Sequence, residues 1–236
     1  MTRRTIGLIW LIAAIVLLSG EHRCWAVFVS YDATADGRYL ELGTVLCSDH
    51  DHQYDAPAHA YFQYSGDPHM PADTGVDTWA GLQTVQANSV AVQSQLYGYT
   101  WFPTGDVESS AAYAANVTLG GLQGLPEGEP LQALATAVWH SGMSESPNLD
   151  GRARIWRGST LLMELSPSVT SGTFPVFRDE TLAVELTHSD ASYAGSGGQT
   201  MFLSYLDFSL QIVPEPAGLL LVLAAGSFVL PHRPRR

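Results

Sequence analysis

The chain has 236 residues and a formal net charge of −12, with 23 acidic residues against 11 arginines and no lysine. Between residues 27 and 213 the imbalance is steeper, because 21 acidic residues there stand against five arginines, a formal charge of −16. Such a surface repels phosphate backbones, so nucleic-acid partners are not expected. The same stretch is long enough for one domain with a substantial core.

Residues 1–26 have the layout of a secretory signal peptide. Two arginines at positions 3 and 4 precede an uncharged, mainly apolar run over residues 6–18. Cys24 and Ala26 then occupy the −3 and −1 positions of a cleavage site, so cleavage between Ala26 and Val27 is predicted. An uncleaved membrane anchor is the alternative, although the run is short for a span. We therefore expect Sec-type export and removal of the signal helix.

Apolar and polar residues alternate with period 2 along residues 27–213, which predicts an all-β fold. Expected strands cover residues 27–31, 39–46, 59–64, 95–101, 113–119, 133–139, 152–156, 161–165, 181–187, 201–205 and 208–212. Turns are expected at Asp36-Gly37, at Asp150-Gly151 and, as a hairpin, at Arg157-Gly158-Ser159. The best helical candidate is residues 83–95. Strands this short and numerous indicate a two-sheet β-sandwich or jelly roll.

Histidine and aspartate are densest within residues 49–77. His50 and His52 alternate with Asp49 and Asp51, so in an extended chain the two histidines share one face. Both are candidate metal ligands, although the long-range spacing of zinc sites is missing. Because the segment is rich in proline and glycine, we expect a solvated loop. No cofactor is expected; Ca²⁺ held by nearby aspartates is an alternative whose site the spacing does not locate.

Tyr97, Tyr99 and Trp101 occupy alternate positions and therefore lie on one face of an expected strand. They would either pack in the core or form a platform on which a sugar ring stacks. Their exposure to solvent distinguishes these two interpretations.

Sequence motifs of catalysis are missing from the chain. It contains no Gly-x-Ser-x-Gly elbow, no phosphate-binding glycine loop and no His-Glu-x-x-His. A non-enzymatic protein is therefore expected, with a secreted hydrolase as the less favoured alternative.

The C-terminal segment, residues 214–236, has three consecutive parts. Pro214, Glu215 and Pro216 precede an uncharged apolar run over residues 217–230. As a helix this run would be about 21 Å long, a short transmembrane segment whose basic end stays cytoplasmic. The basic tail that follows contains Arg233, Arg235 and Arg236.

These three parts, in this order, resemble a PEP-CTERM sorting domain, although two prolines interrupt the basic tail. The resemblance implies transient membrane insertion and recognition of Pro214-Glu215-Pro216 by an exosortase-type protease. It also implies delivery of residues 27–213, the exported domain, to the cell envelope, the cell surface or the extracellular matrix of a bacterium, where biofilm matrix is one setting.

A second resemblance covers residues 151–165 and 179–212. The sequences at 154–162, 181–186 and 206–210 are similar to the back half of a galactose-binding-like jelly roll, which implies sugar or cell-surface glycan binding. The expected function is therefore that of a non-catalytic exported surface or matrix protein, with glycan binding or adhesion. A structural envelope protein without a specific ligand is the alternative.

Overall fold

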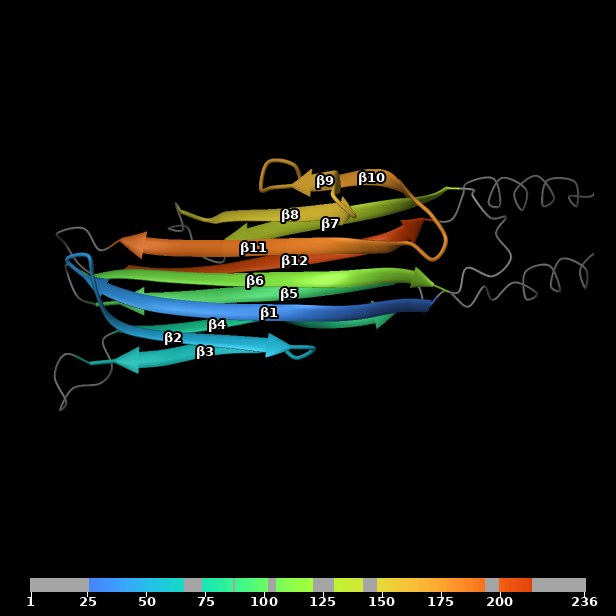
Figure 1. Ribbon diagram of the computed structural model, residues 1–236. Coiled ribbons are helices and arrows are strands. Elements are labelled where there is room, and N and C mark those ends of the chain that lie inside the picture. The colour runs from blue at the N-terminus through green and yellow to red at the C-terminus, as the bar shows by residue number, and fades with distance from the viewer. Residues whose placement is uncertain are drawn as a thin grey trace, which may run out of the picture.

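The computed structural model describes residues 26–65, 74–86, 88–101, 105–120, 130–141, 148–193 and 200–213. These residues form twelve β-strands in two six-stranded antiparallel sheets, which pack face to face (Figure 1). The predicted all-β, two-sheet sandwich is therefore confirmed.

Each sheet collects strands from the whole length of the chain. Sheet A contains β1 (Ala26–Glu41), β2 (Thr44–Tyr54), β6 (Gly105–Gly120), β8 (Asp150–Arg157), β9 (Thr160–Leu165) and β11 (Thr181–Tyr193). Sheet B contains β3 (Ala58–Tyr64), β4 (Thr74–Gln86), β5 (Ser89–Thr100), β7 (Leu131–Ser141), β10 (Ser171–Val176) and β12 (Thr200–Val213). Their spatial orders are β2-β1-β6-β11-β8-β9 and β10-β7-β12-β5-β4-β3.

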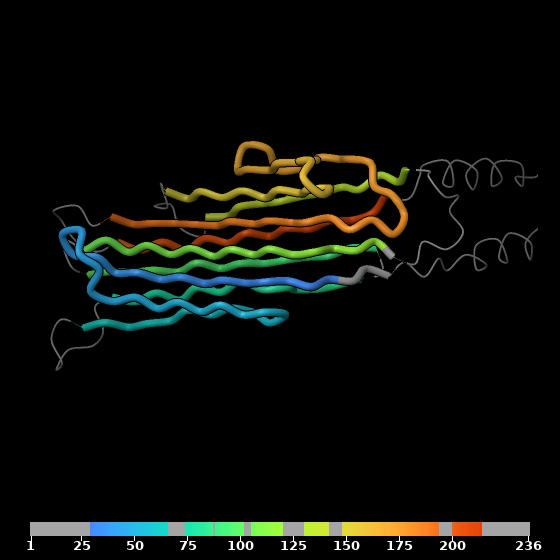
Figure 2. The backbone as a smooth tube through the Cα atoms, in the orientation of Figure 1, coloured from blue at the N-terminus to red at the C-terminus, as the bar shows by residue number. Residues whose placement is uncertain are grey.

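The last two strands complete both sheets. β11 lies between β6 and β8, and β12 lies between β5 and β7 (Figure 2). Pairs far apart in the sequence therefore meet at the centre of each sheet, such as Val117 with Leu182 and Val90 with Leu210. Closing loops of this length costs entropy that only burial of the shared core offsets.

The predicted alternation places one face of each central strand in the core. Leu182, Val184 and Leu186 of β11 are at most 3% exposed, and Phe208 and Leu210 of β12 are 2% exposed. Burying an aliphatic or aromatic side chain of this size contributes about 1.5–3 kcal/mol. The residues between them point outward, so each sheet presents a second, solvent-facing surface.

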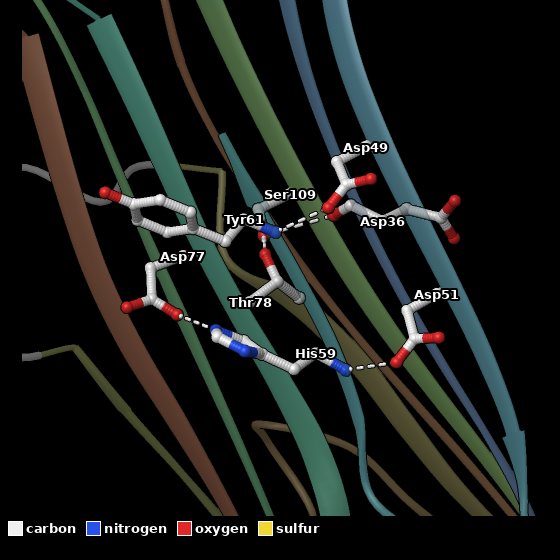
Figure 3. Close-up of polar contacts among 8 residues, drawn as sticks. All are labelled: Asp36, Asp49, Asp51, His59, Tyr61, Asp77, Thr78 and Ser109. Atoms are coloured by element: carbon white, nitrogen blue, oxygen red, sulfur yellow. Dashed lines mark hydrogen bonds and ion pairs between the residues drawn. The ribbon is translucent and has the colours of Figure 1, made fainter. Parts of the chain in front are cut away.

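Residues 49–64 are mostly β-strand, so the prediction of a solvated loop is wrong there. The carboxylates of Asp51 and Asp49 accept hydrogen bonds from the backbone N–H groups of His59 and Tyr61, both at 2.8 Å (Figure 3). The His59 N–H holds the pKa of the Asp51 carboxyl below its usual value. These aspartates satisfy N–H groups at the free edge of β3 and join it to β2 of the other sheet.

Other local predictions are corrected. Asp36-Gly37 lies inside β1 rather than in a turn, because both residues pair with β2 on one side and β6 on the other. Val76 of β4 occupies the space that a side chain at Gly37 would need. The expected strand 39–46 is interrupted at Leu42 and Gly43, whose φ angles are 50° and 78°. The helical candidate 83–95 is the end of β4 and the start of β5, and Asp150-Gly151 begins β8.

The hairpin predicted at Arg157-Gly158-Ser159 is confirmed. It joins β8 to β9, and Gly158 has a φ of 55°, in the left-handed region that glycine adopts without strain.

The predicted signal helix and the sorting segment at 214–236 lie outside the described residues, apart from Ala26, where β1 begins. Within the part of the chain that is described, no helix is long and apolar enough to cross a membrane.

Candidate functional site

Charge is divided unequally between the two sheets. The strands of sheet A carry eleven acidic residues and four arginines. Those of sheet B carry two acidic residues, Asp77 and Asp207, and no arginine. The outer face of sheet B is therefore the less charged surface.

Aromatic side chains concentrate on this outer face in two rows across the strands. In the first row, Asp77 of β4 stands directly opposite Tyr61 of β3 and Tyr97 of β5. In the next row, Gln95 of β5 stands directly opposite Trp79 of β4 and Tyr205 of β12. Side chains directly opposite one another on a face are in contact range. Each row is thus an aromatic–polar–aromatic triplet.

One of the predicted platform residues, Tyr97, belongs to the first triplet, and the other two, Tyr99 and Trp101, follow it in the chain. Tyr97 and Tyr99 point away from the core and are half-buried, with ring centroids 5.7 Å apart. Trp101 follows the end of β5 and is 46% exposed. Burial of these three residues in the core, one of the two interpretations that the sequence allowed, is therefore excluded.

Two glycines of β4 make room for the rings. A Cβ at Gly75 would lie 2.7 Å from the ring of Tyr99, and one at Gly81 would lie 3.0 Å from the ring of Trp79. Both rings therefore lean over the backbone of β4, where a side chain would otherwise stand.

Gly75→Ala should displace the Tyr99 ring while leaving the fold intact. The new methyl group would meet the far end of a flexible surface side chain, so the free energy of unfolding should change by no more than about 0.5 kcal/mol. Near-ultraviolet circular dichroism reports the packing of aromatic side chains and should change. An unchanged spectrum in the Tyr99 region would show that Gly75 does not determine the position of this ring.

Polar groups on the same face are held by their neighbours. His59 Nε2 lies 2.8 Å from Asp77 Oδ1, and Figure 3 shows this pair next to Tyr61. Gln93 donates a hydrogen bond of 2.8 Å to Asp207, and His140 lies 3.6 Å from the same carboxylate. These contacts orient the Asp77 carboxylate between the rings of the first row and the Gln93 amide and Asp207 carboxylate next to the second row, where they can bind hydroxyl or amino groups of a ligand.

The predicted metal ligands, His50 and His52, share the outer face of β2, as the alternation indicated. Each forms a hydrogen bond with an aspartate of β1. His50 Nδ1 lies 2.6 Å from Asp36 Oδ1, and His52 Nε2 contacts Asp32 Oδ1. Among the described residues, no group of three or more His, Cys, Asp or Glu side chains is placed to hold a metal ion.

A shallow depression with a volume of about 320 Å³ lies on the outer face of sheet A. Asp36, Arg38, Glu108 and Tyr193 contribute to its lining. Its charged, open character contrasts with the aromatic face of sheet B.

The interior contains one histidine in contact with a serine. His188 of β11 is 1% exposed, and its Nδ1 lies 2.8 Å from the Oγ of Ser94 on β5. Burial lowers the pKa of His188 to about 3, so the ring is neutral at physiological pH. Because both side chains are enclosed between the sheets, this pair joins the sheets and is closed to a substrate.

Sequence reasoning missed Tyr61, Trp79 and Tyr205 as members of the aromatic face. The available signal was the phase of alternation: Ala60 and Phe62 flank Tyr61 and are buried, which leaves Tyr61 outside. The lateral neighbours of each ring depend on strand order and register, and no local pattern encodes these.

No protein-family model, curated protein or solved structure matches this chain.

Proposed function

We propose that this protein is a non-catalytic, exported surface or matrix protein that binds glycans on the outer face of sheet B. The observation that carries the proposal is the pair of aromatic–polar–aromatic triplets, Tyr61–Asp77–Tyr97 and Trp79–Gln95–Tyr205, on an otherwise weakly charged face. Aromatic rings stack on the apolar faces of sugars, and carboxylate or amide groups between them bind sugar hydroxyls.

Export and sorting belong to the same proposal. The support is the signal-peptide layout of residues 1–26 and the resemblance of residues 214–236 to a PEP-CTERM sorting domain. An exosortase-type protease would act at Pro214-Glu215-Pro216, directly after β12 ends at Val213. The sandwich precedes the sorting segment, so it can be delivered to the envelope, surface or matrix as a complete domain.

Replacing Tyr97 or Trp79 by alanine tests the binding face. A ring that buries roughly 50 Å² of apolar surface against a sugar contributes on the order of 1.3 kcal/mol. Each variant should therefore bind about tenfold more weakly than the wild type. The measurement is a glycan array with the purified protein, followed by titration calorimetry on the glycans that bind.

Tyr54→Ala is the matched control, because Tyr54 is 70% exposed but lies on sheet A. It should bind like the wild type. If the wild type binds no glycan on the array, or if Tyr54→Ala and Tyr97→Ala lower the affinity equally, the proposal that this face binds glycans is wrong.

A further inference from the structure

We propose that the glycan bound by the outer face of sheet B is an extended β-1,4-linked polysaccharide whose sugars carry protonated amino groups. This inference rests on the proposed function and specifies both the shape and the charge of the ligand.

The spacing of the rings supports an extended chain lying across the strands. Tyr61 and Tyr97 are separated by one intervening strand, and so are Trp79 and Tyr205. Neighbouring strands lie about 4.8 Å apart, so rings two strands apart are separated by roughly 10 Å. A β-1,4-linked chain presents the same face at every second sugar, over a comparable length. Two successive rings of a row therefore match two equivalent sugar faces.

The carboxylate between the rings of the first row indicates a positively charged ligand. Asp77 lies directly opposite both Tyr61 and Tyr97, and its side chain is 46% exposed. His59 engages Oδ1, and within the described residues no hydrogen bond is made to Oδ2. A carboxylate flanked by aromatic rings suits an ammonium group, because the ring faces and the carboxylate both attract a cation.

Anionic polysaccharides would be repelled by this face. The strands of sheet B contain no arginine, and the two acidic residues on them, Asp77 and Asp207, both lie on the outer face. The formal charge of −12 on the whole chain adds a long-range repulsion. A uronate or carboxymethylated chain should therefore bind more weakly than a neutral chain of equal length.

Three sets of oligosaccharides, each from two to six sugars long, test this inference on the purified full chain by titration calorimetry. They are β-1,4-linked glucosamine oligomers, cello-oligosaccharides and carboxymethylated cello-oligosaccharides, all at pH 6. The affinity should rise with length in the first two sets. At equal length the glucosamine oligomers should bind about two- to fivefold more tightly than the neutral ones. Salt should weaken only this extra affinity, since it screens the exposed charges.

Asp77→Asn should lower the affinity for the glucosamine oligomers to that for the neutral oligomers. Glu185→Gln removes one negative charge from sheet A and should leave the preference in place. Equal binding of amino and neutral oligomers by the wild type, or a preference that survives Asp77→Asn, would overturn this inference and leave glycan binding standing. Failure of all three sets, together with a silent glycan array, would instead remove the proposed function itself.

Discussion

Phe202→Ala is expected to lower the free energy of unfolding by about 3–5 kcal/mol, the cost typical of removing a buried phenylalanine ring. Phe202 of β12 is 0% exposed and packs in a cluster that includes Tyr39 and Leu96. The ring lies against Gly98 of β5, where a Cβ would come within 2.6 Å of it. Truncation leaves a cavity between the sheets, which urea denaturation followed by circular dichroism would measure.

Gly98→Ala tests the same contact from the other side. Its methyl group would overlap Phe202, and overpacking of this kind costs about 1–3 kcal/mol. Combining Gly98→Ala with Phe202→Leu should cost less than the sum of the two single changes, because the smaller side chain makes room for the methyl group. Strictly additive free energies would show that the Gly98–Phe202 contact is not the source of the loss.

His188 is expected to make the protein sensitive to mild acid. Its pKa is about 3 in the folded state because of burial, against 6.5 for an unperturbed histidine. Between these pH values His188 is protonated in the unfolded chain but not in the folded chain. The free energy of unfolding is therefore unaffected by His188 above about pH 6.5 and decreases as the pH falls toward 3. At pH 4.5 the loss should reach about 2–3 kcal/mol. Urea denaturation at a series of pH values would measure it.

His188→Gln provides the control, because glutamine does not titrate and can still hydrogen-bond to Ser94. The difference in unfolding free energy between wild type and variant should shrink or reverse from pH 7 to pH 4.5. Carboxylates with lowered pKa, such as Asp51, contribute at lower pH, as the solution falls below the usual carboxyl range. Parallel pH profiles of the two proteins would contradict the assignment to His188.

Much of the fold could be predicted from local pattern. The strands around Leu182, Val184 and Leu186, and around Phe208 and Leu210, have clear period-2 alternation, and all five side chains are buried as expected. Local signals failed where a long-range contact overrides them. Gly37 is typical of a turn but lies inside β1, which pairs with β2 on one side and β6 on the other, and the acidic stretch after Asp49 forms a strand because it pairs with β1.

The candidate site shows the same division. Alternation along one strand was enough to place Tyr97 and Tyr99 on a common face, yet it left open whether that face was buried. The packing of the two sheets decided this, and strand order and register placed Asp77 between Tyr61 and Tyr97 and put Trp79 on the strand next to that of Tyr97. The physical reason is that side-chain direction has a period of two residues within a strand, whereas lateral neighbours are chosen by which strands pair. The end segments and the acidic composition are properties of the sequence itself; the aromatic face exists only in the folded sheet.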